Sequence, residues 1–147
     1  MAGADKKNIT KAKILQYIIN NQDTSKVELS KKLNLSMPTV LSNVNDLIEK
    51  GIVLETGEHA STGGRKAKSI AINPGYRYAV GLVITANHLG LVLINMRNEI
   101  EKIERVRLKF SQDMSYCAEV KKLTDEFLED MKEPERILGI GISIPGI

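Results

Sequence analysis

The spacing of the hydrophobic residues changes at Gly51, and this change restricts the fold more than any other feature of the sequence. Before Gly51 the apolar residues recur every three or four positions, as on one face of a helix. After Gly51 they alternate with polar residues or form short runs bounded by glycine and proline, as in strands. The 147 residues therefore predict an α+β chain, with a helical segment first and a sheet-rich segment after it.

Three helices are predicted before Gly51. The first covers residues 10–21, the second begins after Ser25 and the third after Ser36. Ser25 and Glu28 have the spacing of a capping box, in which two side chains satisfy the free N–H groups of a helix start. The short turn between the second and third helices, at residues 34–35, matches a helix-turn-helix motif. In such a motif the last helix enters the major groove of DNA.

Two predicted strands follow the helices, at residues 52–55 and 68–72, and they form a hairpin with a polar tip, the wing. Small polar side chains, one methionine, glycines and cations on the third helix and the wing are the expected DNA contacts. They are Ser36, Met37, Thr39, Ser42, Asn43, Ser61, Thr62, Gly63, Gly64, Arg65, Lys66 and Lys68.

These residue types suit different parts of the duplex. Small polar groups on the helix can meet base edges, and Met37 can contact a thymine methyl group. The wing glycines allow close approach of the backbone, and Arg65 suits a narrow minor groove. The hydroxyls of Ser61 and Thr62 can bond phosphate oxygens. The alternative for each segment is a solvated helix face or a plain loop, but their combination favours DNA binding.

The charge distribution agrees with a polyanionic partner for the first half of the chain. Residues 1–75 carry 11 Lys and Arg against 7 Asp and Glu, whereas residues 76–147 carry 10 against 11. No run approaches the ~20 apolar residues that span a bilayer, and the N-terminus lacks the apolar core of a secretory signal. We therefore expect a cytoplasmic protein without a membrane partner.

Few residues are candidates for metal binding or catalysis. The single cysteine, Cys117, excludes an intrachain disulfide and a Cys-based zinc site. It lies in a predicted helix with no histidine nearby in the sequence, so we interpret it as an inert thiol. His59 and His88 are far apart, and we expect both at the surface. The sequence thus predicts no catalytic residue, no cofactor and no metal.

Asn73-Pro74-Gly75 predicts a domain boundary, which divides the chain into residues 1–75 and 76–147. The second part alternates between strand and helix patterns. Its predicted elements are strands at residues 78–85, 89–95 and 100–110, a helix at 113–131 and an apolar strand at 136–144. The order β-β-β-α-β predicts a mixed sheet with a helix packed on one face.

Four segments together resemble the ROK family (repressors, open reading frames and kinases), and specifically its transcriptional regulators. Residues 33–40 look like the helix-turn-helix of these regulators, and residues 61–67 look like their wing. Residues 78–84 and 138–146 resemble strands of the ROK domain, which has an actin-like ATPase fold. The resemblance implies a winged helix-turn-helix domain in residues 1–75 and a truncated ROK domain in residues 76–147. It also implies a homodimeric repressor of sugar-utilisation genes that binds operator DNA and responds to a sugar.

The departures from the family argue against a kinase. ROK sugar kinases have an Asp and a Gly-Gly-Thr loop after the first strand, to hold metal and phosphates. The matching positions here are Val83 and the segment Thr85-Ala86-Asn87. Valine cannot coordinate Mg²⁺, and loss of the glycines restricts backbone approach to phosphate. The chain also stops at Ile147, before the catalytic Asp, the sugar-binding residues and the zinc cluster of the family. We therefore expect neither an enzyme nor an effector site.

Two alternatives to a DNA-binding repressor stay open at this point. One is a ROK-type sugar kinase, which the valine at position 83 disfavours. The other is a winged-helix module that binds proteins and not DNA. It requires an apolar outer face on the third helix, which Thr39, Ser42 and Asn43 do not supply. In the second half, sheet elements without the rest of an actin-like fold should leave an apolar surface that promotes association.

Overall fold

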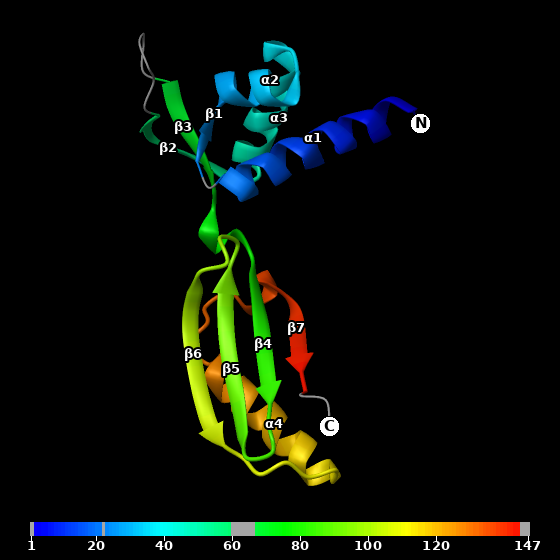
Figure 1. Cartoon of the computed structure of the whole chain (residues 1–147), viewed down its shortest axis with the longest axis vertical. Helices are drawn as coiled ribbons and strands as arrows, with labels where there is room; N and C mark the ends of the chain where they lie inside the picture. Colours follow the sequence, from blue (N-terminus) through cyan, green and yellow to red (C-terminus); the bar gives the residue numbers. More distant parts are fainter. Residues whose placement is uncertain (1, 22, 60–66, 145–147) are drawn as a thin grey trace. The chain divides into compact units, whose positions relative to one another are not determined.

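The computed structural model describes residues 2–21, 23–59 and 67–144. The chain divides into two compact units, Met1–Pro74 and Gly75–Ile147. Within the described residues, the first unit contains three α-helices and a three-stranded sheet, and the second contains a four-stranded sheet and one α-helix (Figure 1). The fold is therefore α+β, with a helical segment before a sheet-rich one, as predicted.

The first unit is a three-helix domain followed by a β-hairpin. In chain order its elements are α1 (Ala2–Asn21), β1 (Thr24–Ser25), α2 (Lys26–Leu33), α3 (Met37–Glu49), β2 (Val53–His59) and β3 (Ala67–Ile72). The three strands form an antiparallel sheet in the order β1-β3-β2. Helices α2 and α3 are the predicted helix-turn-helix, and β2 with β3 is the predicted hairpin.

Local capping explains where α2 and α3 begin. The Ser25 hydroxyl accepts a hydrogen bond from the backbone N–H of Glu28 at 3.1 Å, which confirms the predicted cap of α2. The Ser36 hydroxyl accepts in the same way from the N–H of Thr39 at 3.4 Å, and Pro38 lies in the first turn of α3. Both helix starts are therefore determined by residues that are recognisable in the sequence.

Left-handed backbone conformations separate these elements. Asn34, between α2 and α3, has a φ of 51°, and Gly51, after α3, has a φ of 68°. Asparagine and glycine adopt this conformation more readily than other residues do. Each residue therefore ends a helix and turns the chain sharply, so that α3 follows α2 after only three residues.

The core of the first unit draws apolar side chains from all three helices and from the hairpin. Its members are at most 1% exposed, and they are Ile14, Ile18, Leu29, Val40, Val44, Leu47, Val53, Ile70 and Ile72. Burial on this scale removes one whole face of α3 from water. The orientation of α3 about its own axis is therefore determined by packing.

The second unit is a mixed sheet with a helix on one face. Its regular elements are β4 (Tyr78–Ile84), β5 (His88–Asn95), β6 (Ile100–Arg107), α4 (Met114–Phe127) and β7 (Ile137–Ser143), and short 3₁₀ turns lie at Pro74–Tyr76 and Pro134–Arg136. The strand order is β6-β5-β4-β7, with β7 parallel to β4 and the other pairs antiparallel. This confirms the predicted order β-β-β-α-β.

Helix α4 covers the middle of this sheet (Figure 1). Its residues Tyr116 and Phe127 pack in one buried cluster with alternate residues of β4 and β5. The strand residues of the cluster are Val80, Leu82, Ile84, Leu89, Leu91 and Leu93. Helix α4 therefore covers one face of β4 and β5.

Strand β7 is less covered than its sequence predicts. Its apolar run is typical of a buried strand, yet Leu138, Ile140, Ile142 and the following Ile144 are 69%, 51%, 61% and 62% exposed. This strand is an edge of the sheet, and α4 packs on β4 and β5. Among the described residues, these four apolar side chains are therefore left uncovered. None of the described helices has the length and apolar character needed to cross a membrane.

Candidate nucleic-acid interface

One side of α3 is buried in the core and the other side is exposed. The buried residues are Val40, Asn43, Val44 and Leu47. Exposed residues recur at the opposite positions, three or four residues apart, so they share one face. They are Pro38, Leu41, Ser42, Asn45 and Glu49, which we call the outer face of α3. This face therefore carries three polar side chains, one proline and one exposed leucine.

Asn43 does not lie on the outer face, and its expected outward position was wrong. The residue is 4% exposed, and its Nδ2 donates a hydrogen bond to the backbone oxygen of Thr39 at 2.8 Å. Asn43 follows Val40 by three residues and precedes Leu47 by four, so helical geometry puts it in the buried stripe. The outward asparagine of α3 is Asn45.

The other predicted residues of α3 gather at its N-terminal half. Ser36 and Thr39 are engaged with each other, since their hydroxyl oxygens lie 2.8 Å apart. Met37 is 38% exposed at the first helical position, and Ser42 lies on the outer face one turn further along. Of the five helix residues predicted to contact DNA, four are thus near one another at the surface or in the cap.

The hairpin carries the predicted wing, of which the structure describes a part. The predicted tip residues Ser61, Thr62, Gly63, Gly64, Arg65 and Lys66 lie outside the described residues. The remaining wing residue, Lys68, lies on β3 with its side chain 75% exposed. The pairing of β2 with β3 shifts between Thr56 and Glu58, and Gly57 between them has a φ of 43°. This shift is a β-bulge, which increases the local twist of the hairpin.

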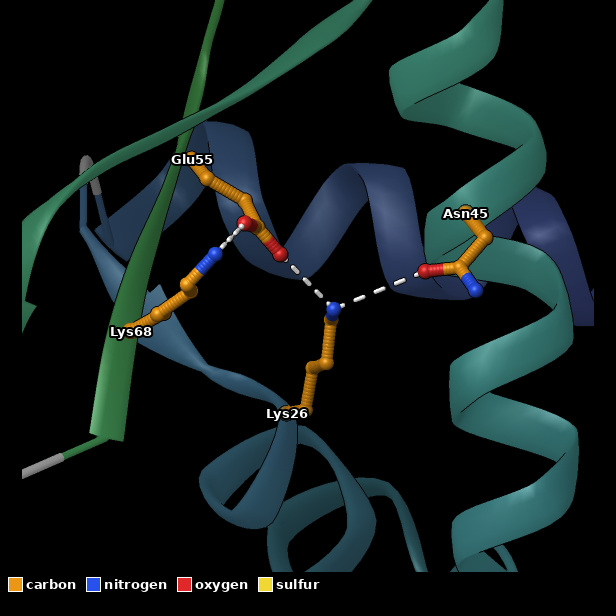
Figure 2. Close-up of polar contacts among 4 residues, drawn as sticks. All are labelled: Lys26, Asn45, Glu55 and Lys68. Atoms are coloured by element: carbon orange, nitrogen blue, oxygen red, sulfur yellow. Dashed lines mark hydrogen bonds and ion pairs between the residues drawn. The ribbon is translucent and has the colours of Figure 1, made fainter. Parts of the chain in front are cut away.

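A carboxylate of the hairpin binds two lysines, one on α2 and one on β3 (Figure 2). Glu55 on β2 accepts hydrogen bonds from Lys26 Nζ at 2.8 Å and from Lys68 Nζ at 2.7 Å, each on a separate oxygen. Lys26 Nζ also lies 3.5 Å from Oδ1 of Asn45. These four residues form what we call the Lys26 network. It connects α2, α3, β2 and β3.

The lysines determine the charge state of Glu55. The hydrogen bond from Lys26, and then that from Lys68, lower the pKa of the Glu55 carboxyl from 4.5 to about 2. Desolvation acts in the opposite direction but is the smaller effect. Glu55 is therefore ionised at neutral pH, and it holds both ammonium groups by charge-assisted hydrogen bonds.

A second lysine-bound carboxylate lies on α3. Asp46 contacts Lys11 of α1 and Lys50 at the end of α3, and the hydrogen bond from Lys11 is the largest cause of the lowered pKa of Asp46. The contact connects α1 to α3. Two lysines from other helices thus contact α3: Lys11 of α1 binds Asp46, and Lys26 of α2 binds Asn45.

Lys26, Asn45 and Glu55 were not among the predicted site residues. Asn45 could have been found from the sequence, because it follows Ser42 by three residues and so lies on the same face of the helix. No local pattern could reveal the contact between Lys26 and Glu55, because they are 29 residues apart in the sequence.

The turn after β4 contains Thr85, Ala86 and Asn87, the residues that match the glycine loop of ROK kinases in sequence position. Val83 is 45% exposed near the end of β4. In the turn that follows, the Thr85 hydroxyl donates to the backbone oxygen of His88 and accepts from its N–H, both at 3.1 Å. The carbonyls of Ala86 and Asn87 accept hydrogen bonds from the chain after β6. The turn is therefore occupied by its own hydrogen bonds.

Other candidate groups of the second unit lie at the surface. His88 Nδ1 is 3.2 Å from a guanidinium nitrogen of Arg105, and Cys117 is an exposed free thiol. Throughout the part of the chain that the structure describes, no three His, Cys, Asp or Glu side chains are grouped as metal ligands.

The comparisons with known proteins agree with this geometry. A model of the family described as winged helix-turn-helix DNA-binding matches residues 7–53. The xylose repressor of Caldicellulosiruptor bescii is 30% identical over 145 residues, which is 96% of this chain and 36% of that protein. The xylose repressor of Bacillus subtilis is 27% identical, with coverage of 96% and 37%. The Escherichia coli DNA-binding transcriptional dual regulator NagC is 21% identical, with coverage of 96% and 35%.

A solved structure has the same fold. It is a ROK family transcriptional regulator, a homolog of the E. coli MLC protein, and it superimposes with a TM-score of 0.65 at 20% identity. The match covers 95% of this chain and 36% of that one. The chain therefore spans little more than a third of the length of the relatives that it matches. The predicted resemblance to ROK regulators is confirmed.

Proposed function

This chain has the fold of a ROK-family transcriptional regulator over nearly all of its length, and we propose that it binds double-stranded operator DNA. Residues 1–75 would be the DNA-binding domain and residues 76–147 the first part of the ROK domain. One observation carries the proposal: α3 buries one face completely and exposes Leu41, Ser42 and Asn45 on the other. A helix held in this way can enter the major groove without rearrangement.

Each exposed group has a role on DNA in this proposal. Ser42 and Asn45 bond base edges, and Leu41 and Met37 contact thymine methyl groups. Lys68, which is 75% exposed, meets phosphate together with the wing tip. The predicted contacts at Ser36, Thr39 and residues 61–66 belong to the same proposal. Because Asn43 is buried, we propose Asn45 for the base contact that the sequence predicts at Asn43.

We further propose that the protein represses genes of sugar utilisation. Its relatives are named as repressors for xylose and for N-acetylglucosamine. A homodimer would present two α3 helices to half-sites about 34 Å apart, one turn of DNA. A sugar effector would act on the full-length regulator. The uncovered apolar residues of β7 offer surface for such association.

The alternatives have less support. A sugar kinase needs a carboxylate where Val83 stands and a free loop where the Thr85 turn is hydrogen-bonded to His88. A protein-binding module needs a largely apolar outer face, whereas Leu41 has Ser42 and Asn45 beside it. We therefore propose that the chain is not an enzyme and that DNA is its partner.

Selection of bound sites from random duplex DNA tests the proposal. We expect one enriched sequence, bound at least about 10³-fold more tightly than scrambled duplex at physiological salt. Affinity for it should fall by roughly 0.9 log units per log unit of salt for each phosphate contacted. If no sequence is enriched and selected and scrambled duplexes bind equally, the proposal is wrong.

A further inference from the structure

The carboxamide of Asn45 is oriented by a neighbouring ammonium group. Oδ1 of Asn45 lies 3.5 Å from Lys26 Nζ. An ammonium group has donors and no acceptor, so a rotated carboxamide would place two donors against each other. The carbonyl oxygen therefore faces Lys26, and the Nδ2 amino group points away from it (Figure 2).

Lys26 is itself held in place. It is the first residue of α2, directly after the Ser25 cap, and its side chain is only 21% exposed. Its Nζ donates to Glu55 at 2.8 Å, and the other oxygen of Glu55 is held by Lys68 at 2.7 Å. Charge-assisted hydrogen bonds of this length are stronger than a neutral contact. Glu55 therefore determines where the ammonium of Lys26 lies, and Lys26 determines how Asn45 is oriented.

The orientation has a consequence for base recognition. A free asparagine bonds adenine with both groups: its carbonyl accepts from N6 and its amino group donates to N7. With its carbonyl turned to Lys26, Asn45 cannot rotate that oxygen toward adenine N6 without losing the contact, so the amino group is the group that it offers. Guanine presents two acceptors, N7 and O6, on the same edge, whereas the amino group of adenine would find no acceptor.

We propose that Lys26, positioned by Glu55, makes Asn45 a hydrogen-bond donor in the major groove and thereby selects guanine over adenine at one operator position. Asn45 is the residue that touches the base, and Lys26 and Glu55 are positioning residues. This inference rests on the proposed function, because it requires that the outer face of α3 lies in the major groove.

The test measures binding to four duplexes that differ only at the position read by Asn45. Asn45→Ala identifies this position as the one where discrimination is lost. We expect the unmodified chain to prefer guanine over adenine by about tenfold, the lower range for a good base contact. Lys26→Met should free the carbonyl and change the guanine-to-adenine ratio about tenfold toward adenine.

Lys68→Met is the matched control: it removes the lysine on the other oxygen of Glu55, leaves the bond from Lys26 to its own oxygen in place and does not touch Asn45. It should weaken binding to all four duplexes by one common factor and leave the ratio unchanged. Circular dichroism and thermal unfolding verify that each variant is folded. If Lys26→Met does not fold, Glu55→Gln, which loosens Lys26, provides the same readout.

The outcomes separate this inference from the proposed function. If the unmodified chain binds the selected duplex but Lys26→Met keeps its guanine-to-adenine ratio, Lys26 does not orient Asn45 and the inference is wrong. An adenine preference in the unmodified chain would mean that Lys26 leaves Asn45 for a phosphate, and it would also overturn the inference. Equal binding of the unmodified chain to all four duplexes would overturn the inference alone. If the selected and scrambled duplexes bind equally, the proposed function fails and the inference fails with it.

Discussion

The two units of this chain bury their apolar residues to different extents. In the first unit, core residues such as Leu29 and Val44 are completely buried. In the second unit, Leu138 on β7 and Ile103 on β6 are 69% and 67% exposed. Three helices and a hairpin close around one core in the first unit, whereas α4 packs on only the middle of the sheet in the second.

This difference in burial corresponds to the two proposed roles, recognition of DNA by the first unit and association with other protein by the second. A recognition helix must be held rigidly, and the closed core of the first unit together with the contacts of Lys11, Asp46 and the Lys26 network provides this for α3. An open sheet edge with exposed apolar residues is suited to packing against other protein surface. The first unit thus has the closed core that the proposed DNA-binding domain requires, whereas the second leaves apolar side chains of β6 and β7 exposed.

The largest test of this comparison is a matched pair of leucine substitutions. Leu29→Ala should lower the free energy of unfolding by about 2–5 kcal/mol, because it leaves a cavity in a closed core. Leu138→Ala should change it by only about 0.5 kcal/mol, because the side chain is already in water. Urea unfolding followed by circular dichroism measures both. Equal losses in the two variants would remove the distinction between a closed and an open unit.

The next test compares two asparagines two residues apart. Asn45→Ala should weaken binding to the selected duplex by about 1–3 kcal/mol and relax discrimination at one position, because it removes a base contact. Asn43→Ala should lower stability by about 1 kcal/mol, since it removes the bond to Thr39, and should leave discrimination unchanged. Binding competition across single-base variants measures both. If Asn43→Ala relaxes discrimination and Asn45→Ala does not, the original assignment was right.

Features with local causes could be predicted from the sequence. The serine caps at Ser25 and Ser36, the turn at Gly51 and the alternating strands of the second unit all depend on residues close together in the chain. The fold class and the helix-turn-helix followed from these. In the second unit, the predicted order of elements along the chain, β-β-β-α-β, agreed for the same reason.

Features that depend on distant contacts could not be predicted. Strand β1 is two residues long, and it exists because it pairs with β3 more than forty positions later. Helix α1 begins at Ala2, well before the predicted residue 10, in a stretch without an apolar stripe. The Lys26 network joins residues from four elements. Asn43 is a different case, since its burial followed from helical geometry and the face was assigned incorrectly.

A smaller effect is expected from pH, and it concerns the first unit. The pKa of Glu55 is about 2 in the folded protein against 4.5 for the free side chain. A lowered folded pKa means that the stabilisation is fully present above pH 4.5 and is lost as the pH falls toward 2. Because the pair is partly exposed to solvent, we expect a contribution of about 1 kcal/mol.

Glu55→Gln measures this contribution. Between pH 6 and pH 3, the variant should lose about 1 kcal/mol less stability than the unmodified chain, since it has no carboxylate to protonate. Asp46→Asn should act in the same direction, because lysines also lower the pKa of Asp46. Parallel pH profiles for Glu55→Gln and the unmodified chain would show that the Lys26 network does not contribute to the stability of the first unit.

The smallest effect is expected from Val83→Asp in the second unit. Leu82 and Ile84 point toward α4, so Val83 points to the opposite face of the sheet, where it is 45% exposed. An aspartate there meets water, and stability should fall by no more than about 1 kcal/mol, the range of strand propensities.

Restoring the carboxylate should also produce no ATP-dependent phosphorylation of a hexose or an amino sugar. The turn after β4 has Ala86 and Asn87 in place of the glycines that let a backbone approach phosphate, and its Thr85 hydroxyl is bonded to His88. A coupled assay for ADP release, with the unmodified chain beside the variant, measures this. Turnover by the unmodified chain would contradict a purely regulatory protein, and turnover by Val83→Asp alone would show that one substitution separates the two functions.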